Sequence, residues 1–330
     1  MFFKMNIIWA SVLLVGGLLM LWKSADMLVD GAVGLAKRLG VSALVVGLTV
    51  VAMGTSAPEV AASIAAVLQK GGGDIAIGNV FGSNIANLAL VGGLAALIRP
   101  IRVQKKILQR EMPVMLLVAL LLWPFLKNLS LSRPEGVLLL AVFSALIFIT
   151  VYMAQKESRN NAEAMARASG QSGESDSAKT LKANILFVVI GLAGLAVGAK
   201  LAVTGAVFVG IKVGLSEGVI GLTIIAFGTS LPELVTCVVA AVKGHHDISI
   251  GNLVGSNIFN TLLVTGAASA VRPFDVAKRF AGGADYWIMI IVSGVFFLMA
   301  LAGRRISRAG GIVLFCGYVA YIVYLLAFSA

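Results

Sequence analysis

The chain contains an internal duplication that limits how it can fold. Residues 47–59 read GLTVVAMGTSAPE, and residues 221–233 read GLTIIAFGTSLPE. A second stretch, GNVFGSNIAN at 78–87, returns as GNLVGSNIFN at 251–260. The two matches keep the same order, with offsets of 174 and 173 residues. Chance similarity does not give two long matches at nearly one offset, so the chain is built from two homologous halves.

The duplication divides the chain into three parts. We expect residues 1–154 and 183–330 to form two copies of one unit, with residues 155–182 between them. The intervening stretch is rich in Ser, Ala, Asn and charged residues and has no apolar period. Such a composition cannot bury enough apolar surface to order itself. It is interpreted as a solvent-exposed linker, in which only residues 163–167 could be helical.

Both halves consist mainly of long apolar runs. The chain is 59% hydrophobic and 12% charged, whereas a soluble domain is about 45–50% apolar and about 25% charged. Apolar runs of about 17 residues or more can cross a bilayer as helices. The first run is not read as a signal peptide, because no small-x-small cleavage site follows it. The fold class predicted is an all-α membrane protein with ten transmembrane helices, near 5–29, 41–69, 75–98, 111–126, 135–154, 183–211, 216–242, 248–271, 285–303 and 309–328.

Five helices per half make the second copy enter the membrane from the opposite side. The halves should therefore be inverted repeats, an architecture of secondary transporters. With the N-terminus outside, sixteen loop Lys and Arg residues lie inside and eight outside. This bias predicts that both termini lie outside and the linker lies in the cytoplasm, in a bacterial inner membrane. The net charge of +11 then reflects cytoplasmic loops and gives no reason to expect a nucleic-acid partner.

Two glutamates lie within apolar helices at equivalent places in the two halves. Glu59 and Glu233 each end a Gly-Thr-Ser-x-Pro-Glu segment. A carboxylate at membrane depth costs several kcal/mol, so it normally faces a partner or a water-filled cavity. Residues at repeat-equivalent positions should meet near the axis that relates the halves. Together they carry two negative charges, which match one divalent cation.

The prolines before these glutamates should interrupt the helices. Pro58 and Pro232 have no N–H to donate, which frees carbonyls around residues 52–55 and 226–229. Bare carbonyls at membrane depth are tolerated where they line a cavity. The same segments supply the hydroxyls of Thr55, Ser56, Thr229 and Ser230. An all-oxygen set of this kind suits calcium and sodium.

The second repeated motif adds polar side chains that could complete the site. Ser83 and Asn87 are four residues apart, as are Ser256 and Asn260, so each pair shares one helix face. Asn84 and Asn257 lie beside them. Glycines in these motifs, at 78, 82, 251 and 255, permit close approach of helices. We expect these helices to pack against the glutamate-bearing ones.

Several polar residues have simpler explanations. The two cysteines, Cys237 and Cys316, lie in apolar segments and are interpreted as small core residues. Asp26 and Asp30 are interpreted as a solvated helix end.

A structural ion pair of the glutamates with Lys23 or Lys200 is the main alternative to an ion site. An intramembrane protease would need the two acids alone with a water molecule, so the surrounding hydroxyls disfavour an enzyme, and the closed central site disfavours a channel.

The segments GTSAPE and GTSLPE, followed by GSNIAN and GSNIFN, resemble the two α-repeats of the cation/calcium exchanger superfamily, and above all its prokaryotic sodium/calcium exchangers. The resemblance covers the whole chain and implies sodium/calcium antiport by alternating access, in which the first and sixth helices slide across the rest. It implies that calcium and sodium are the transported ions and that the protein contacts membrane lipid. It implies no cofactor, no enzymatic activity and no obligate protein partner.

The resemblance also implies which residues bind ions. It assigns calcium to Glu59, Glu233 and the carbonyls of Thr55 and Thr229, and sodium to those glutamates with Ser56, Ser83, Ser230, Ser256 and the carbonyls of Ala52 and Ala226. Asn87 and Asn260 would flank the central position. Some superfamily members have Asp where this chain has Asn260, which disfavours potassium dependence here. Proton-driven and potassium-dependent cation antiport remain the open alternatives.

Overall fold

The computed structural model describes residues 6–168, 180–214, 220 and 226–328 of the chain. Within these residues, nine helical segments are long and apolar enough to span a membrane. A tenth, shorter apolar helix covers Leu231–Val242. It forms the second part of the helix predicted at 216–242, whose residues 216–219 and 221–225 lie outside the described residues. The protein is therefore an all-α membrane protein, as the sequence predicts.

The first half begins with one long helix, which two interrupted helices follow. Several spans change locally to π-helical turns, labelled η, as expected where a helix carries functional residues. The elements are α1 (Ile7–Leu39), α2 (Ala43–Val46), η2 (Gly47–Val51), α3 (Ala52–Thr55), α4 (Ala57–Leu68), α5 (Gly73–Ile85), η3 (Ala86–Val91), α6 (Gly92–Ile98), η4 (Ile107–Glu111), α7 (Met112–Leu126) and α8 (Arg133–Ala168).

The second half repeats this order. Its elements are α9 (Leu181–Lys212), α11 (Ala226–Thr229), α12 (Leu231–Val242), α13 (His246–Phe259), η6 (Asn260–Val264), α14 (Thr265–Val271), α15 (Ala284–Gly303) and α16 (Arg308–Phe328). Both halves place a π-helical turn after the GSN motif, η3 in the first and η6 in the second. The local backbone thus follows the duplicated sequence.

Two short antiparallel strand pairs join the halves. Strand β1 (Ile101–Arg102) pairs with β4 (Arg305–Ile306), and β2 (Ser130–Leu131) pairs with β3 (Phe274–Asp275). By the sequence offset of 173, β1 corresponds to β3, and by position between the matching helices, β2 corresponds to β4. Exchanging the halves therefore turns one strand pair into the other, which is the relation expected for inverted repeats about a two-fold axis.

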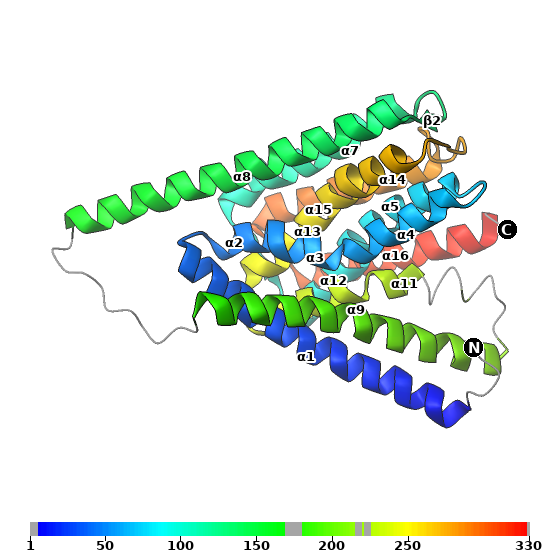
Figure 1. Ribbon diagram of the computed structural model, residues 1–330, viewed down its shortest axis with the longest axis horizontal. Coiled ribbons are helices and arrows are strands. Elements are labelled where there is room, and N and C mark those ends of the chain that lie inside the picture. Colours follow the sequence, from blue (N-terminus) through cyan, green and yellow to red (C-terminus); the bar gives the residue numbers. More distant parts are fainter. Residues whose placement is uncertain (1–5, 169–179, 215–219, 221–225, 329–330) are drawn as a thin grey trace.

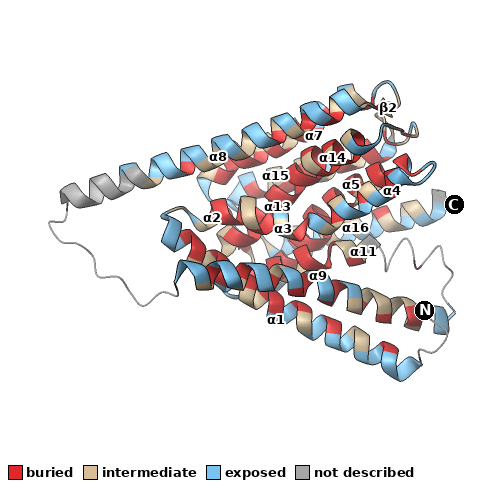
Figure 2. Cartoon of the chain, in the orientation of Figure 1, coloured by how far each residue is buried: buried red, intermediate tan, exposed pale blue. Residues whose placement is uncertain are grey.

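The packing separates one helix pair from the remaining helices. Helices α1 and α9 lie side by side along one edge of the molecule (Figure 1) and form an apolar cluster with parts of α12 and η2. A larger core combines α5, α6, α7, α13, α15 and α16. Figure 2 shows the buried residues concentrated along the centre, while the outer faces of α1, α8 and α9 are largely exposed. Exposed apolar faces of this kind are suited to lipid.

Some predicted helix boundaries were wrong. The first helix does not end at residue 29 but continues to Leu39, where Gly40 adopts a left-handed conformation and closes the helix with hydrogen bonds to Ala36 and Lys37. The fourth begins at Ile107 rather than at 111. The helix predicted at 135–154 continues as α8 to Ala168, so the first part of the expected linker is helical. Its Ala-, Glu- and Met-rich sequence favours helix, and no Gly or Pro interrupts it before residue 170.

Candidate functional site

The helices that bear the two glutamates are both broken one turn earlier. Ser56 separates α3 from α4 with φ −85° and ψ 3°, and Ser230 separates α11 from α12 with φ −88° and ψ 3°. A proline follows two residues after each break. Because these prolines carry no N–H, the carbonyls four residues earlier lose their usual helical donor. Glu59 and Glu233 consequently occupy the first turn of a new helix, where the backbone N–H groups favour negative charge.

Both glutamates are completely buried and lie near each other. Each has an exposed fraction of 0%, and their carboxylates are close enough to repel one another. The hydroxyl of Ser56 donates to Oε1 of Glu233 at 3.3 Å, which links the halves. Neither glutamate forms an ion pair within the described part of the chain. The alternative of a structural ion pair with lysine is not supported, since Lys23 contacts Asp26 instead, at 3.5 Å.

Many polar atoms of the two repeated motifs are buried without hydrogen-bond partners. They include both carboxylate oxygens of Glu59 and one of Glu233. The remaining ones among the predicted site residues are the amide atoms of Asn87 and Asn260 and the hydroxyls of Ser230 and Ser256. More than 90% of buried polar groups in proteins normally have a partner. Such a concentration of unpaired oxygens indicates that these residues bind something that the polypeptide itself does not supply.

Helix packing brings the two repeated motifs together. The glutamate helix α4 packs on α5 and η6, and α12 packs on α13 and η3. Asn87 lies in η3, which packs on the glutamate helix α12 of the other half, and Asn260 is the first residue of η6, which packs on α4. Gly251 and Gly255 allow close packing as predicted: a Cβ on Gly255 would lie 2.7 Å from the carbonyl oxygen of Leu48. Ser83, Asn87, Ser256 and Asn260 are all buried.

Some predicted site residues already have hydrogen-bond partners or are only partly buried. The carbonyl of Ala52, predicted to be free, accepts the backbone N–H of Ser56 at 3.0 Å and the hydroxyl of Thr55 at 3.4 Å. That hydroxyl also donates to Asn252 Oδ1 at 3.0 Å. Thr229 is half-buried in α11, and Ala226 is the first residue of that helix. Because a carbonyl has two lone pairs, Ala52 could still bind a cation alongside the N–H of Ser56.

Sequence reasoning missed a pair of hydrogen-bond networks behind the glutamates. In the first half, Asn79 Nδ2 donates to Ser63 Oγ at 2.8 Å and to the carbonyl oxygen of Glu59 at 3.2 Å. In the second half, Asn252 Nδ2 donates to Cys237 Sγ at 3.3 Å. Asn79 and Asn252 occupy the same place in the repeated Gly-Asn dipeptides. Their recurrence in apolar helices was the signal that could have identified them.

These networks also explain Ser63 and Cys237 beyond simple packing. Ser63 Oγ donates to the carbonyl of Ala76 at 3.4 Å, and Cys237 Sγ donates to that of Ser249 at 3.5 Å. The four residues are related by the duplication. The thiol thus takes the place of the hydroxyl, and each network fixes its glutamate helix against the following helix. Cys316, in contrast, is exposed on α16.

The site is chemically suited to hard cations. No group of three or more His, Cys, Asp or Glu side chains is assembled among the described residues. Two carboxylates with hydroxyl, amide and carbonyl oxygens form the kind of set that calcium prefers. Two unpaired carboxylates buried together are costly unless a positive charge compensates them.

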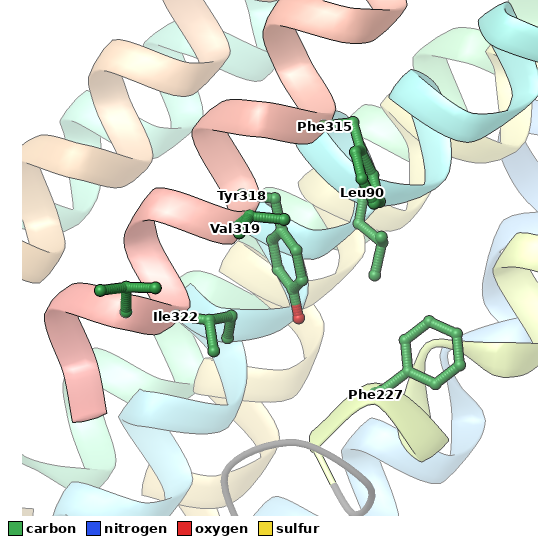
Figure 3. A pocket seen from close by; sticks show the side chains of 7 residues that line it. Leu90, Phe227, Phe315, Tyr318, Val319 and Ile322 are labelled. Carbon is green, nitrogen blue, oxygen red and sulfur yellow. The ribbon is translucent and has the colours of Figure 1, made fainter.

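A mostly apolar cavity elsewhere in the structure is unrelated to this chemistry. It has a volume of about 380 Å³ and lies between α16, η3 and α11, where Phe227, Phe315 and Tyr318 face it (Figure 3). Leu90, Val319, Ile322 and Val323 complete the lining. The hydroxyl of Tyr318 is the one polar side-chain group among these residues. An apolar lining of this kind cannot compensate the charge of a cation, so the cavity is not part of the candidate site.

Comparison with known proteins agrees with the geometry. The family model described as sodium/calcium exchanger protein matches residues 9–152 and 183–327. The inner membrane protein YrbG of Escherichia coli is 37% identical over 96% of this chain and 96% of its own length. The sodium/calcium exchanger MaX1 of Methanosarcina acetivorans is 36% identical over 95% of this chain and 97% of its own length. A solved structure of the sodium-calcium exchanger NCX_Mj superposes with a TM-score of 0.81 at 30% identity, over 97% of this chain and 99% of that one.

Proposed function

This chain belongs to the sodium/calcium exchanger family, and we propose that it exchanges sodium ions for calcium ions through an alternating-access site built around Glu59 and Glu233. Membership of the family makes it an integral membrane antiporter for cations, rather than an enzyme that needs a cofactor. The proposal adds the coupling ion, the site residues and the transport mechanism.

One observation carries the proposal. The two carboxylates lie buried together with no ion pair among the described residues, and the repeated motifs of both halves contain further buried polar atoms without hydrogen-bond partners. Burying two like charges costs several kcal/mol per ion without compensation. A divalent cation offsets that cost in one state, and several sodium ions can offset it in another. Competition for one set of ligands is what couples the two fluxes.

The roles of the individual residues follow the sequence prediction. Calcium would bind between Glu59 and Glu233. Sodium would use the same glutamates with hydroxyl groups from both repeated motifs. The full proposed set is Glu59, Glu233, Thr55, Thr229, Ser56, Ser230, Ser83, Ser256, Asn87, Asn260 and the carbonyls of Ala52 and Ala226. The hydroxyl of Ser56, which already contacts Glu233, supports a shared site that draws on both halves.

Alternating access would come from movement of α1 and α9 relative to the remaining helices. Their mutual packing is close, since a Cβ on Gly17 would lie 2.5 Å from the backbone nitrogen of Ala202. The breaks before both glutamate helices lie against α9: added methyl groups on Gly54 and Gly228 would meet Leu192 and Val203, respectively. A pair that moves as one body could therefore open the site to either side.

The membrane orientation and the domain division complete the proposal. Residues 1–154 and 183–330 would form the two inverted repeats, and residues 155–182 would connect them in the cytoplasm, with both termini outside. The excess of Lys and Arg in the loops on the linker side supports this orientation. The gap between the two segments that the family matches supports this division.

The test is radioactive calcium uptake into liposomes that contain the purified protein. Vesicles loaded with sodium are diluted into buffer free of sodium and potassium, and the assay is repeated with a proton gradient in place of the sodium gradient. We expect uptake with the sodium gradient alone. Uptake only with the proton gradient would replace sodium as the coupling ion, and absence of calcium flux under both gradients from folded protein would refute the proposal.

A further inference from the structure

A basic pocket lies at one end of the molecule, away from the glutamate site. Its volume is about 390 Å³, and it is lined by Arg99, Pro100, Arg102, Gly244, His246 and Arg305. These residues come from the segment after α6, from the connection between α12 and α13 together with the first residue of α13, and from the segment between α15 and α16. Both halves of the chain thus contribute, but none of the residues in the candidate ion site does.

The positive charges in this pocket face one another. Arg102 and Arg305 are direct partners in the antiparallel pair formed by β1 and β4. Like charges directly opposite one another in a strand pair are destabilising. Arg99 and Arg102 both lie close enough to His246 to interact with it electrostatically. Nδ1 of His246 is buried and has no hydrogen-bond partner.

No carboxylate neutralises these arginines in the part of the chain that the structure describes. Arg99, Arg102 and Arg305 form no ion pair there. The nearby acid Asp247 accepts a hydrogen bond from Gln104 at 2.7 Å instead. Within the described residues, the three arginines of the pocket therefore have no carboxylate within ion-pair distance.

Comparison with the opposite end of the molecule shows which of these arginines has a structural role. Arg99 Nη1 donates to the carbonyl of Val242 at 2.7 Å, at the end of α12. Its counterpart Arg272 donates to the carbonyl of Leu68 at 2.8 Å, at the end of α4. Binding the end of the glutamate helix is thus common to both ends, and it explains Arg99 and Arg272 alike.

The other basic residues have no such counterpart. By the sequence offset of 173, Asp275 stands in the place of Arg102. By its place in the strand pair, Ser130, the partner of Asp275, matches Arg305, the partner of Arg102. These two residues are register partners in the pair formed by β2 and β3. The opposite end therefore combines one arginine with an acid and a hydroxyl. The paired arginines occur only at the end that carries most of the basic loops.

Membrane topology alone does not explain this arrangement. A preference for Lys and Arg in cytoplasmic loops accounts for the number of basic residues. It gives no reason for two arginines to stand opposite each other beside a third arginine around a pocket. A bound anion would remove the repulsion between them.

We propose that this pocket binds a phosphate group, as a free phosphate ion or as the headgroup of an anionic phospholipid. The planar guanidinium groups of arginine suit the oxygens of phosphate, which can accept paired hydrogen bonds. A neutral His246 with its N–H at Nδ1 would add a donor. Basic pockets between the ends of membrane helices are positions where acidic lipid headgroups bind. The site is independent of the ion that the protein transports.

The experiment measures phosphate and lipid binding by the purified full-length protein. One arm titrates inorganic phosphate, and the other uses native mass spectrometry with phosphatidylglycerol and, for comparison, the zwitterionic phosphatidylcholine. The variant is Arg102→Gln combined with Arg305→Gln, and the control is Lys105→Gln. Lys105 is an exposed lysine on the same segment that does not line the pocket. We expect the double variant to lose at least about tenfold in affinity and the control to change less than about twofold.

A second variant guards against a loss of folding. Arg102→Asp introduces the residue type that the opposite end carries at Asp275 and places this acid across from Arg305. It should abolish binding while the strand pair is retained or stabilised, as a thermal unfolding midpoint no lower than that of the unmodified protein would show. Binding in the phosphate arm identifies the free ion as a ligand, and binding in the phosphatidylglycerol arm alone identifies the headgroup. No binding in either arm, or equal losses in the pocket variants and in Lys105→Gln, would overturn the proposal.

Discussion

The two halves of the chain are alike at the centre of the molecule and different at its ends. At the centre, Asn79 with Ser63 and Asn252 with Cys237 form matching networks behind the two glutamates. At the ends, the matching positions carry residues of different charge. Under the proposed mechanism, the centre would bind the same ions from both sides while each end would meet a different aqueous phase, so only the centre would be constrained to remain symmetric.

The first and sixth helices give the clearest example. Lys243 forms ion pairs with Asp26 and with Asp30 of α1, the latter at 2.6 Å. These aspartates were predicted to be a solvated helix end, and that prediction was wrong. The repeat places Lys200 and Thr204 at the equivalent positions of α9. The part of α1 around Asp26 and Asp30, well before its end at Leu39, therefore forms ion pairs with Lys243 at the end of α12, and the equivalent residues of α9 cannot make this contact.

The largest expected effect concerns the two glutamates. Glu59→Gln and Glu233→Gln should each lower calcium transport by on the order of 100-fold, because each removes one of two charges that face a divalent cation. The exposed Glu157 provides a control, since Glu157→Gln removes a carboxylate of an exposed ion pair. Calcium flux into liposomes measures the effect, with circular dichroism to verify folding. Normal flux in either variant would place the site elsewhere.

The next largest effect concerns the packing of α1 on α9. A methyl group on Gly17 would overlap the backbone of α9, and one on Gly191 would overlap α1 at Leu28. Gly17→Ala and Gly191→Ala should therefore each destabilise the protein by about 1–3 kcal/mol. Gly16→Ala is the matched control, because nothing lies within 4 Å of the added group. Thermal unfolding in detergent measures the difference, and equal midpoints for Gly16→Ala and Gly17→Ala would contradict the packing.

A smaller effect should arise at the repeated asparagines. Asn87 and Asn260 are both fully buried with unpartnered amides. Asn260→Asp adds a negative charge and should change the preference between calcium and monovalent ions by about tenfold, which corresponds to about 1.4 kcal/mol. Asn87→Asp tests the symmetry. Equal changes in competition assays would indicate a symmetric site, and unchanged preferences in both variants would exclude these positions from it.

The smallest effect concerns the ion pairs of Lys243 with Asp26 and Asp30. Burial alone would lower the pKa of Lys243, but hydrogen bonds to Asp26 and Asp30 raise it above its usual value of 10.5. Its stabilising contribution is thus complete at neutral pH and is lost only as the pH rises above that value. These partly exposed ion pairs are each worth about 0.2–1 kcal/mol.

Lys243→Gln should therefore change transport only a few-fold, because the part of α1 around Asp26 and Asp30 would separate more easily from α12. Lys200→Gln, at the place equivalent to Asp26, should have no such effect. Measurements of cysteine accessibility in α1 near Asp26 and Asp30 distinguish the two variants. Equal accessibility in Lys243→Gln and the unmodified protein would show that the ion pairs do not restrain α1.

Much of the fold could be predicted because the signal is repeated and physically simple. Long apolar runs have few alternatives to membrane helices, and the odd number of helices per half required inversion. The π-helical turns at η3 and η6 could not be predicted, because they depend on how neighbouring helices press on the GSN segments. The helical extension of α8 was predicted only around residues 163–167, because the polar composition of the remaining stretch was interpreted as disorder, although its Ala-rich sequence favours helix.

The sequence by itself determined the two halves, the breaks at Pro58 and Pro232 and the residues that carry the oxygens, since these depend on local chemistry and on periodicity along the chain. Only the tertiary structure decided which of these oxygens lack partners, that Lys243 binds α1, and that Arg102 stands opposite Arg305. Each of these facts depends on contacts between residues more than a hundred positions apart. Local sequence sets what a residue can do, and the packing of distant segments sets which neighbour it meets.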